Sequence, residues 1–182
     1  MKYQIPFAAN TLIKLCTDRK LTIATAESCT GGLVAGALTN VPGSSAVFDR
    51  GFVTYSNAAK REMLGVPPAT LKQYGEVSRQ TAEAMAHGAL AEANVDLAVS
   101  ITGSAGPGGA TADKPVGLVH FAAASRSGIS MHAAKRYGDI GRDDVRLESV
   151  LQALRMLAEL AEEESASRKT EAGKTGKGHK AS

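Results

Sequence analysis

The apolar residues of this 182-residue chain alternate between two spacings, which predict helices and strands in turn. The first stripe has helical spacing and predicts an opening amphipathic helix; its members are Ala9, Leu12, Ile13 and Cys16. A continuous apolar run over residues 21–26 then predicts a buried strand, and residues 33–38 predict the helix after it. Further strands are predicted at residues 47–55, 97–102, 118–124 and 129–137.

Helix signals separate these strands. Ser56 is placed to cap a short helix that Gly65 ends, and Ser78 is placed to cap a longer one. The final helix is predicted over residues 142–164, and the last two strands are predicted to form a hairpin. This alternation predicts an α/β protein, a three-layer α/β/α sandwich around a mixed, mostly parallel five-stranded sheet.

The composition changes near the end of the chain. The apolar periodicity stops by Glu164, and residues 165–182 are rich in Gly, Ser and Lys, which predicts a disordered basic tail behind one domain at residues 1–164. The tail contains five basic residues and one acidic residue, a net charge of +4. Because the whole chain carries +3, the remainder carries −1, so the basic balance belongs to the tail rather than to a binding face.

Composition also disfavours several classes of function. The chain has no Trp and 4% aromatic residues, so stacking platforms for single-stranded nucleic acid, and direct nucleic-acid binding, are not expected. No apolar run approaches the ~20 residues that span a bilayer, and no signal peptide is recognisable, so we expect a cytoplasmic protein without membrane contact. The cysteines, Cys16 and Cys29, lack zinc-site spacing, and we expect no metal and no other cofactor.

The candidate chemistry centres on the segment AESCTGG, which lies between the first strand and the helix after it. Ser28 at this strand-to-helix turn can attack a carbonyl group. The oxyanion that forms is then stabilised by nearby backbone amides, those of Thr30, Gly31 or Gly32. Two alternatives stay open from these residues alone. Ser28 can be an ordinary helix N-cap, or Cys29 can be the nucleophile, because a helix N-terminus favours a thiolate.

Ser28 needs a base, and none of the four histidines follows a strand exit, so a Ser-His-Asp arrangement is not supported. Lys60 lies one turn into the helix after the second strand, from where its side chain can reach back to the strand exit. A partly desolvated lysine at a helix N-terminus has a lowered pKa and can accept a serine proton. Tyr55 at the same exit can relay or orient that proton. The alternatives are a solvated surface lysine and a tyrosine that only packs.

A glycine-rich loop, residues 103–110, follows the third strand and suits an anion, because its glycines expose backbone N–H groups. Ligands of such sheets bind at the carboxyl ends of the strands. The loop, Ser28 and Tyr55 all lie at strand exits and are therefore expected to share one crevice. Three basic residues can add charge for a phosphate there, or equally be surface charges: Lys114, Arg142 and Arg146.

Several separate motifs occur in order along the chain. They are AESCTGG at 26–32, GSS at 43–45, GFVTYSN at 51–57 with Lys60, GV at 65–66, AGP at 105–107 and KPVG at 114–117. Together these motifs resemble the CinA C-terminal domain family, over residues 8–162. The resemblance implies a three-layer α/β/α fold with a mixed sheet and a homodimer. It also implies the stand-alone form of a family whose longer members carry a separate N-terminal domain.

The same resemblance implies a nicotinamide-nucleotide amidohydrolase, which converts nicotinamide mononucleotide (NMN) and water to nicotinate mononucleotide and ammonia in pyridine nucleotide salvage. The family is described as a serine amidase of Ser/Lys type without a metal. By motif, Ser28 is then the nucleophile, Lys60 the general base and Tyr55 its partner. The residues expected to bind substrate are Glu27, Thr30, Gly31, Gly32, Thr102, Gly103, Gly106, Gly109, Lys114 and Arg142.

A function of a different class is the alternative. The same fold can serve as a non-catalytic nucleotide-binding or partner-binding module, since the family name is also associated with competence and DNA damage. The presence of Ser28, Tyr55 and Lys60 together favours the enzyme, because a binding module needs no serine–lysine pair.

Overall fold

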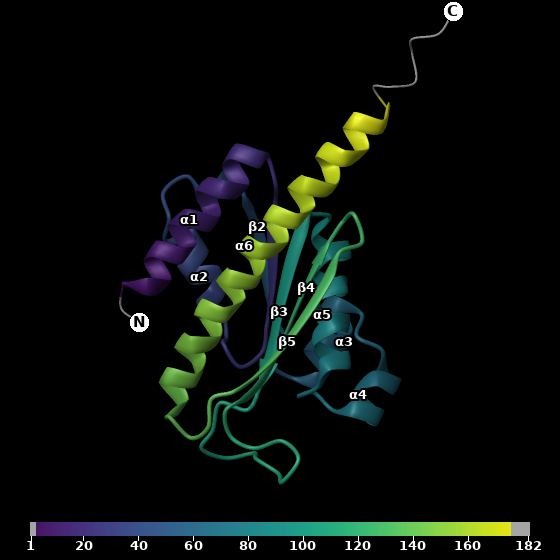
Figure 1. Ribbon diagram of the computed structural model, residues 1–182. Helices are drawn as coiled ribbons and strands as arrows, with labels where there is room; N and C mark the ends of the chain where they lie inside the picture. The colour runs from purple at the N-terminus through teal and green to yellow at the C-terminus, as the bar shows by residue number, and fades with distance from the viewer. Residues whose placement is uncertain (1–2, 176–182) are drawn as a thin grey trace, which may run out of the picture.

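The computed structural model describes residues 3–175, which form one sheet with helices on both sides (Figure 1). The elements run in the order α1 (Gln4–Arg19), β1 (Ile23–Glu27), α2 (Leu33–Thr39), η1 (Ser44–Ala46), β2 (Phe48–Val53), α3 (Asn57–Leu64), α4 (Pro68–Tyr74), α5 (Arg79–Ala93), β3 (Leu97–Gly103), β4 (Leu118–Ser125), β5 (Ser130–Arg136) and α6 (Arg142–Thr175). Every predicted strand is present, and each end lies within two residues of its predicted position.

The five strands form one mixed sheet in the order β2-β1-β3-β4-β5. β1 runs parallel to β2 and β3, β4 is antiparallel to β3, and β5 is antiparallel to β4. Four strands thus share one direction, which confirms the predicted mixed, mostly parallel sheet. The carboxyl ends of the three parallel neighbours therefore meet at one edge of the sheet, at Glu27, Val53 and Gly103.

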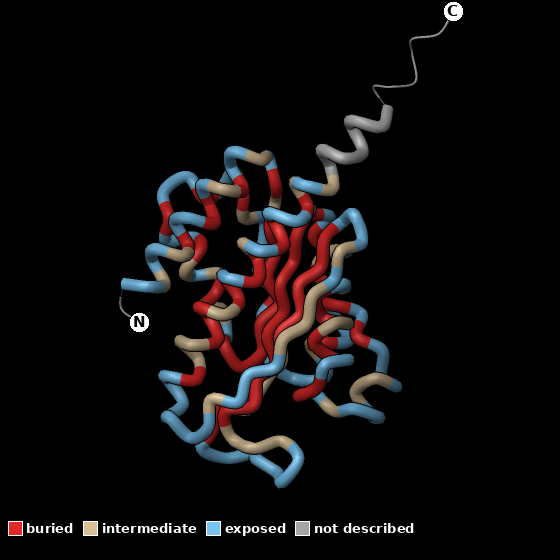
Figure 2. The backbone as a smooth tube through the Cα atoms, viewed as in Figure 1, coloured by how far each residue is buried: buried red, intermediate tan, exposed pale blue. Residues whose placement is uncertain are grey.

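Helices cover both faces of the sheet, which confirms the three-layer sandwich. α1, α2 and α6 lie on one face, and α3, α4 and α5 lie on the other (Figure 1). Side chains alternate along β1, so that Ile23 packs in one core with Leu12 and Leu154, whereas Ala24 packs in the other with Met85. Figure 2 shows the central strands buried between helices whose outer surfaces are exposed.

The caps predicted for two helices on the second face are confirmed. Ser56 Oγ accepts a hydrogen bond from Ala59 N at 3.0 Å at the start of α3. Ser78 Oγ accepts one from Thr81 N at 3.2 Å at the start of α5. Gly65 ends α3 in the left-handed region, with φ of 63°, as predicted. Both ends of α3 are therefore fixed, next to the exit of β2.

The C-terminal end differs from the prediction. The sequence predicts a helix end by Glu164, but α6 continues to Thr175, so residues 165–175 of the predicted disordered tail are helical. Most residues of this segment are tolerated in helices, and extending an existing helix costs far less than starting one. The apolar stripe stops where α6 leaves the core, which is why periodicity places the end too early. The rest of the predicted tail, residues 176–182, lies outside the described residues.

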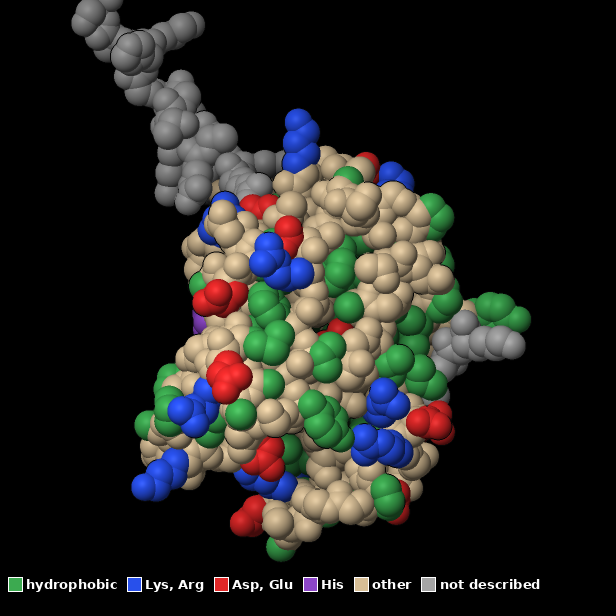
Figure 3. Space-filling view, turned by 180° about the vertical axis from the view of Figure 1, so that it is seen from behind, with side chains coloured by type: hydrophobic (Ala, Val, Ile, Leu, Met, Phe, Trp, Pro, Cys, Tyr) green, Lys and Arg blue, Asp and Glu red, His purple; other side chains and the backbone are tan. Residues whose placement is uncertain are grey.

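Two further observations concern the apolar character of the helices and the distribution of charge on one face. None of the described helices combines the length and apolar character that a membrane span requires. Figure 3 shows the molecule from behind, where acidic and basic side chains are interspersed with apolar ones. The charges on that face therefore form no extended surface of a single sign.

The helix packing yields a testable stability difference between two glycines. A Cβ on Gly88 in α5 would lie 2.0 Å from the carbonyl O of Leu64, at the end of α3. We predict that Gly88→Ala lowers the free energy of unfolding by roughly 1–3 kcal/mol, because backbone atoms must move. The control Gly36→Ala in α2, where a Cβ meets no atom within 4 Å, is expected to raise it by up to ~1 kcal/mol. Urea unfolding measures both, and equal effects would contradict the close approach.

Candidate active site

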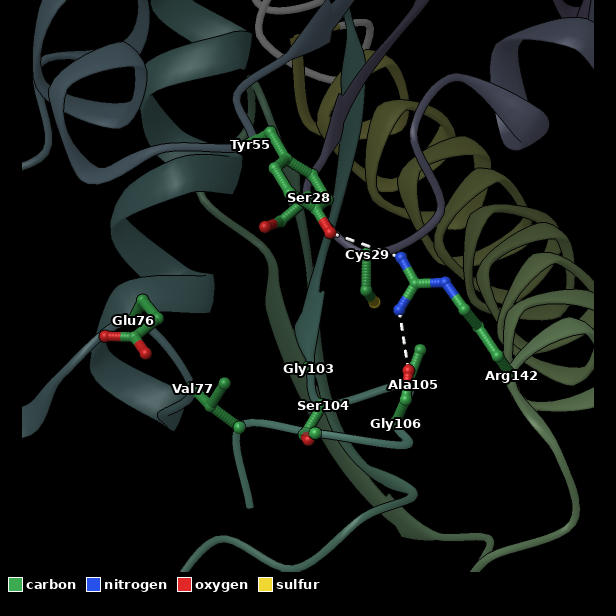
Figure 4. A pocket seen from close by; sticks show the side chains of 12 residues that line it. Ser28, Cys29, Tyr55, Glu76, Val77, Gly103, Ser104, Ala105, Gly106 and Arg142 are labelled. Atoms are coloured by element: carbon green, nitrogen blue, oxygen red, sulfur yellow. Dashed lines mark hydrogen bonds between the residues drawn. The ribbon is translucent and has the colours of Figure 1, made fainter. Parts of the chain in front are cut away.

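The carboxyl ends of the parallel strands open into a pocket of about 240 Å³ (Figure 4). Its lining residues come from the turn after β1, the segment after β2, the α4–α5 loop, the glycine-rich loop and the start of α6. They are Ser28, Cys29, Tyr55, Glu76, Val77, Gly103, Ser104, Ala105, Gly106, Gly108, Gly109 and Arg142. The structure thus brings Ser28, Tyr55 and Gly103 together in one crevice, as expected from their strand exits.

Beside this pocket lies a lysine with no exposed surface, Lys60. Its Nζ is 3.1 Å from Ser28 Oγ, 2.8 Å from the carbonyl O of Thr54 and 3.3 Å from that of Tyr55. Side chains on a helix lean toward its N-terminus, so Lys60 in the first turn of α3 reaches back to the exit of β2. The structure therefore brings the predicted serine and lysine into contact, and the alternative of a solvated surface lysine is wrong.

The surroundings of Lys60 favour its neutral form. Burial lowers the pKa of Lys60 below its ordinary value of 10.5, while Glu76 and Cys29 oppose this shift more weakly. A neutral amine has two N–H bonds, which can donate to the two carbonyls, and one lone pair, which can accept a hydroxyl proton. The amine can therefore take the proton of Ser28 while keeping both carbonyl contacts.

The rival nucleophile, Cys29, lies in the same pocket but is poorly suited to attack. Its side chain is 5% exposed, and burial raises the pKa of the thiol to about 12. A buried thiol with this pKa carries almost no thiolate near neutral pH, and the thiolate is the nucleophile. The backbone amide of Cys29 donates to no other residue within the described part of the chain.

Two of the three amides predicted to stabilise an oxyanion are used inside the turn. Gly31 N donates to the carbonyl O of Ser28 at 3.1 Å, and Gly32 N donates to Glu27 Oε2 at 3.0 Å. Over residues 3–175, only the Thr30 amide of the three makes no such bond, and none of the three residues lines the pocket. The amides of Gly31 and Gly32 therefore stabilise the turn itself, and the stabilisation of an oxyanion by these residues stays a prediction.

The carboxylate of Glu27 has a structural role in place of the predicted substrate contact. Glu27 is 1% exposed. It accepts hydrogen bonds from the amides of Gly32, Val34 and Ala35 at 3.0, 3.1 and 2.8 Å. These are the amides at the start of α2 that lack partners within the helix. Because Glu27 supplies the cap, the alternative that Ser28 is the N-cap is wrong, and the hydroxyl of Ser28 is left for Lys60.

Tyr55 contributes to the pocket differently from the prediction. Its backbone carbonyl contacts Lys60, but its hydroxyl lies 3.2 Å from Arg142 Nη2, and its side chain is 63% exposed. Arg142 also donates to the carbonyl O of Gly106 at 2.8 Å. The Tyr55 hydroxyl therefore contacts Arg142 and not Lys60, and its role as partner of the base stays a prediction. Tyr55 and Arg142 contact each other and line the pocket beside the glycine-rich loop (Figure 4).

Two further predicted contacts, Lys114 and Thr102, lie outside the pocket lining. Lys114 Nζ donates to the carbonyl O of Tyr74 at 2.8 Å, at the end of α4. Thr102 Oγ1 donates to the carbonyl O of Glu76 at 2.7 Å, in the α4–α5 loop. Both side chains therefore tether the segment that precedes α5, and their assignment as substrate contacts stays a prediction.

Arg146 likewise holds main-chain atoms. Its Nε donates to the carbonyl O of Cys29 at 3.1 Å, and its Nη2 donates to that of Thr30 at 3.3 Å. Two hydrogen bonds to main-chain carbonyls fix the orientation of this guanidinium. Arg146 thus fixes the turn that carries Ser28, and of the three basic residues considered, Arg142 is the one that lines the pocket.

Sequence reasoning does not single out the pocket residues of the α4–α5 loop, Glu76 and Val77. No local pattern marks them, since they reach the strand exits only because α5 packs across β1 and β3. The side chains of Ser104 and Ala105 are also unpredicted, although the loop that carries them is the expected one.

The described residues hold no metal-site cluster. No three His, Cys, Asp or Glu side chains among them come together as a metal ion requires. The strand histidines His120 and His132 contact each other through ring nitrogens 3.1 Å apart, and neither lines the pocket. The polar side chains that do line it carry three hydroxyls, a guanidinium and a carboxylate, which suit a polar organic ligand.

Comparison with known proteins identifies the group to which this arrangement belongs. The CinA C-terminal domain matches residues 7–161. The chain belongs to the CinA C-terminal domain family. It is 53% identical over 133 residues to the nicotinamide-nucleotide amidohydrolase PncC of Enterobacter agglomerans, a match that covers 72% of this chain and 80% of that protein. A CinA-like protein of Chlorobaculum tepidum is 47% identical over 149 residues, which is 79% of this chain.

Solved structures of the CinA family share the fold. The crystal structure of the competence/damage inducible protein CihA from Agrobacterium tumefaciens superposes with a TM-score of 0.85 at 57% identity, over 86% of this chain and 95% of that one. A CinA-superfamily protein from Klebsiella pneumoniae gives 0.83 at 33% identity. The chain spans only about a third of the length of the CinA-like protein, 35%, but most of the amidohydrolase.

The role of Glu27 can be tested by stability. We predict that Glu27→Gln lowers the free energy of unfolding by roughly 1–3 kcal/mol, because a carboxamide replaces one of two buried acceptor oxygens with a donor. Glu92→Gln, an exposed substitution on α5, is the control and should change it by less than ~0.5 kcal/mol. Chemical denaturation followed by circular dichroism measures both. An unchanged stability in Glu27→Gln would mean that the carboxylate does not hold the start of α2.

Proposed function

We propose that this chain is an amidohydrolase of Ser/Lys type that converts NMN and water to nicotinate mononucleotide and ammonia, a step of pyridine nucleotide salvage. The observation that carries the proposal is the 3.1 Å contact between Lys60 Nζ and Ser28 Oγ, made by an amine whose pKa burial lowers. The similarity to a nicotinamide-nucleotide amidohydrolase supports the choice of substrate. A binding module gains nothing from burying a lysine against a serine.

The chemistry follows from the contacts of Lys60. The neutral amine accepts the Ser28 proton as Oγ attacks the carboxamide carbon, and a tetrahedral intermediate forms. We assign its oxyanion to the backbone amide of Cys29, which lines the pocket and donates to no other described residue. The Lys60 ammonium then protonates the leaving nitrogen, and ammonia departs. Water, deprotonated by the same amine, hydrolyses the acyl–Ser28 ester and releases nicotinate mononucleotide.

The other end of the substrate requires an anion site. Arg142 is the one cationic side chain that lines the described pocket. It lies against Gly106, and the neighbouring Gly108 and Gly109 also line the pocket. A guanidinium beside exposed glycine amides is a suitable receptor for a phosphate. We therefore assign the phosphate of NMN to Arg142 and this loop.

The direct test is ammonia release by the purified protein. Incubation with NMN should yield equal amounts of ammonia and nicotinate mononucleotide, measured by an ammonia assay and by chromatography. Nicotinamide riboside, which lacks the phosphate, is the control and should react much more slowly at equal concentration. Binding of NMN without any ammonia release would favour the non-catalytic module instead.

The nucleophile can be identified with two neighbouring substitutions. We predict that Ser28→Ala lowers kcat by at least about 10³-fold, because one member of a nucleophile–base pair is lost. Cys29→Ala should lower kcat by less than about tenfold, since its buried thiol only lines the pocket. Steady-state kinetics with NMN measures both, and circular dichroism checks the fold. If the two effects were reversed, Cys29 would be the nucleophile.

The pH dependence tests the base. Only neutral Lys60 accepts the Ser28 proton, so kcat should rise with pH through the pKa of Lys60, which lies below 10.5. Lys60→Arg keeps the charge but does not deprotonate in this range, so it should be nearly inactive at every pH tested. Titration calorimetry with NMN then shows whether the variant still binds. Retention of most activity in Lys60→Arg would move the base to another group.

A further inference from the structure

Two charged side chains of opposite sign line the pocket, and only one of them has hydrogen-bond partners among the described residues. Figure 4 shows Arg142 and Glu76 on opposite sides of the pocket. Arg142 is committed to the carbonyl O of Gly106 and the hydroxyl of Tyr55. The carboxylate of Glu76 is exposed and makes no hydrogen bond or ion pair to any residue between 3 and 175. One charge of the pocket is thus free to face a ligand.

The position of Glu76 is nevertheless well defined. The carbonyl O of Glu76 accepts a hydrogen bond from the buried Thr102 Oγ1 at 2.7 Å. This bond attaches the Glu76 backbone to the carboxyl end of β3. On one side, Gly75 O accepts from Ser78 Oγ and Thr81 Oγ1 at 3.0 and 2.7 Å. On the other side, Val77 is buried. The backbone of Glu76 is therefore fixed at the strand exits, across the pocket from Arg142.

The charge of Glu76 also reaches the reaction centre. It is one of the groups that raise the pKa of Lys60 against the larger effect of burial. Lys60 is in contact with Ser28, so any ligand group next to Ser28 lies in the field of this carboxylate. The pocket therefore carries a positive charge on one side and a negative charge on the other, and Ser28 lines the same pocket.

NMN has the matching charges. Its phosphate is an anion, and its ring is a pyridinium cation that carries the carboxamide. If the carboxamide lies at Ser28 and the phosphate at Arg142, the ring occupies the part of the pocket that Glu76 faces. We propose that Glu76 is a specificity-determining residue that recognises the positive charge of the pyridinium ring and disfavours the uncharged, reduced ring. This inference rests on the proposed function and adds a second recognition element to it.

Binding to an inactive protein tests the idea without interference from ring reactivity. The dissociation constants of NMN and of its reduced form, which has a neutral dihydropyridine ring and the same carboxamide, ribose and phosphate, are measured by calorimetry on Ser28→Ala. Adding Glu76→Gln should raise the dissociation constant of NMN by about tenfold, because one charge–charge attraction is removed. The dissociation constant of the reduced form should not change. Adding Glu92→Gln on the exposed face of α5 is the matched control and should change neither constant.

The outcomes separate this inference from the proposed function. Equal weakening of both ligands by Glu76→Gln would mean that Glu76 contacts a part they share, such as the ribose, and would overturn the proposal. No change for either ligand would overturn it as well. In both cases ammonia release from NMN by the wild-type protein would still stand. Absence of that release from wild type would instead refute the proposed function, on which the assignment of Glu76 depends.

Discussion

A lysine amine held away from water against a serine hydroxyl is the contact on which the rest of the site depends. A buried ammonium is costly unless its donors are satisfied, and Lys60 has two carbonyls and the Ser28 hydroxyl within reach. The carbonyls lie just after β2, and Ser28 lies just after the neighbouring β1. Parallel pairing of these strands, followed by the Ser56 cap of α3, brings all of these groups to one point. The same burial that makes the ammonium costly prepares the neutral amine as a base.

In the turn after β1, the nucleophile Ser28 lies next to the N-terminus of α2, whose free amides could bind its hydroxyl. The first amides of α2 need acceptors, and a serine next to them would ordinarily serve as the cap. Glu27 accepts from three of these amides, so Ser28 does not have to. Arg146 fixes the same turn through the carbonyls of Cys29 and Thr30. The turn that carries the nucleophile is thus held by a buried carboxylate and a half-buried guanidinium, which gives the site a fixed geometry.

Features with a local physical signal were predictable from the sequence. Buried apolar runs located the strands, and the order of elements gave the sheet. The pairing of Ser28 with Lys60 followed from a strand exit and a helix start. The hydrogen-bond partners of Glu27 and of the Tyr55 hydroxyl were not predicted, because they depend on side-chain directions that spacing does not specify. Glu76 was not predicted at all, since only the long-range packing of α5 brings it to the pocket. The end of α6 was misplaced, because helix extension beyond a core needs no apolar stripe.

The state of the Lys60 amine is the central claim, and direct titration measures it. Nuclear magnetic resonance of protein labelled with ¹³C at lysine Cε follows each amine through its protonation, and the Lys60→Arg variant identifies the signal of Lys60. We predict that this signal titrates clearly below the ordinary lysine value of 10.5, whereas the exposed Lys14, whose pKa is raised by its hydrogen bond to Asp18, does not show this depression. A Lys60 signal that titrates at or above that value would contradict the account, because Ser28 would then face a permanent cation and not a base.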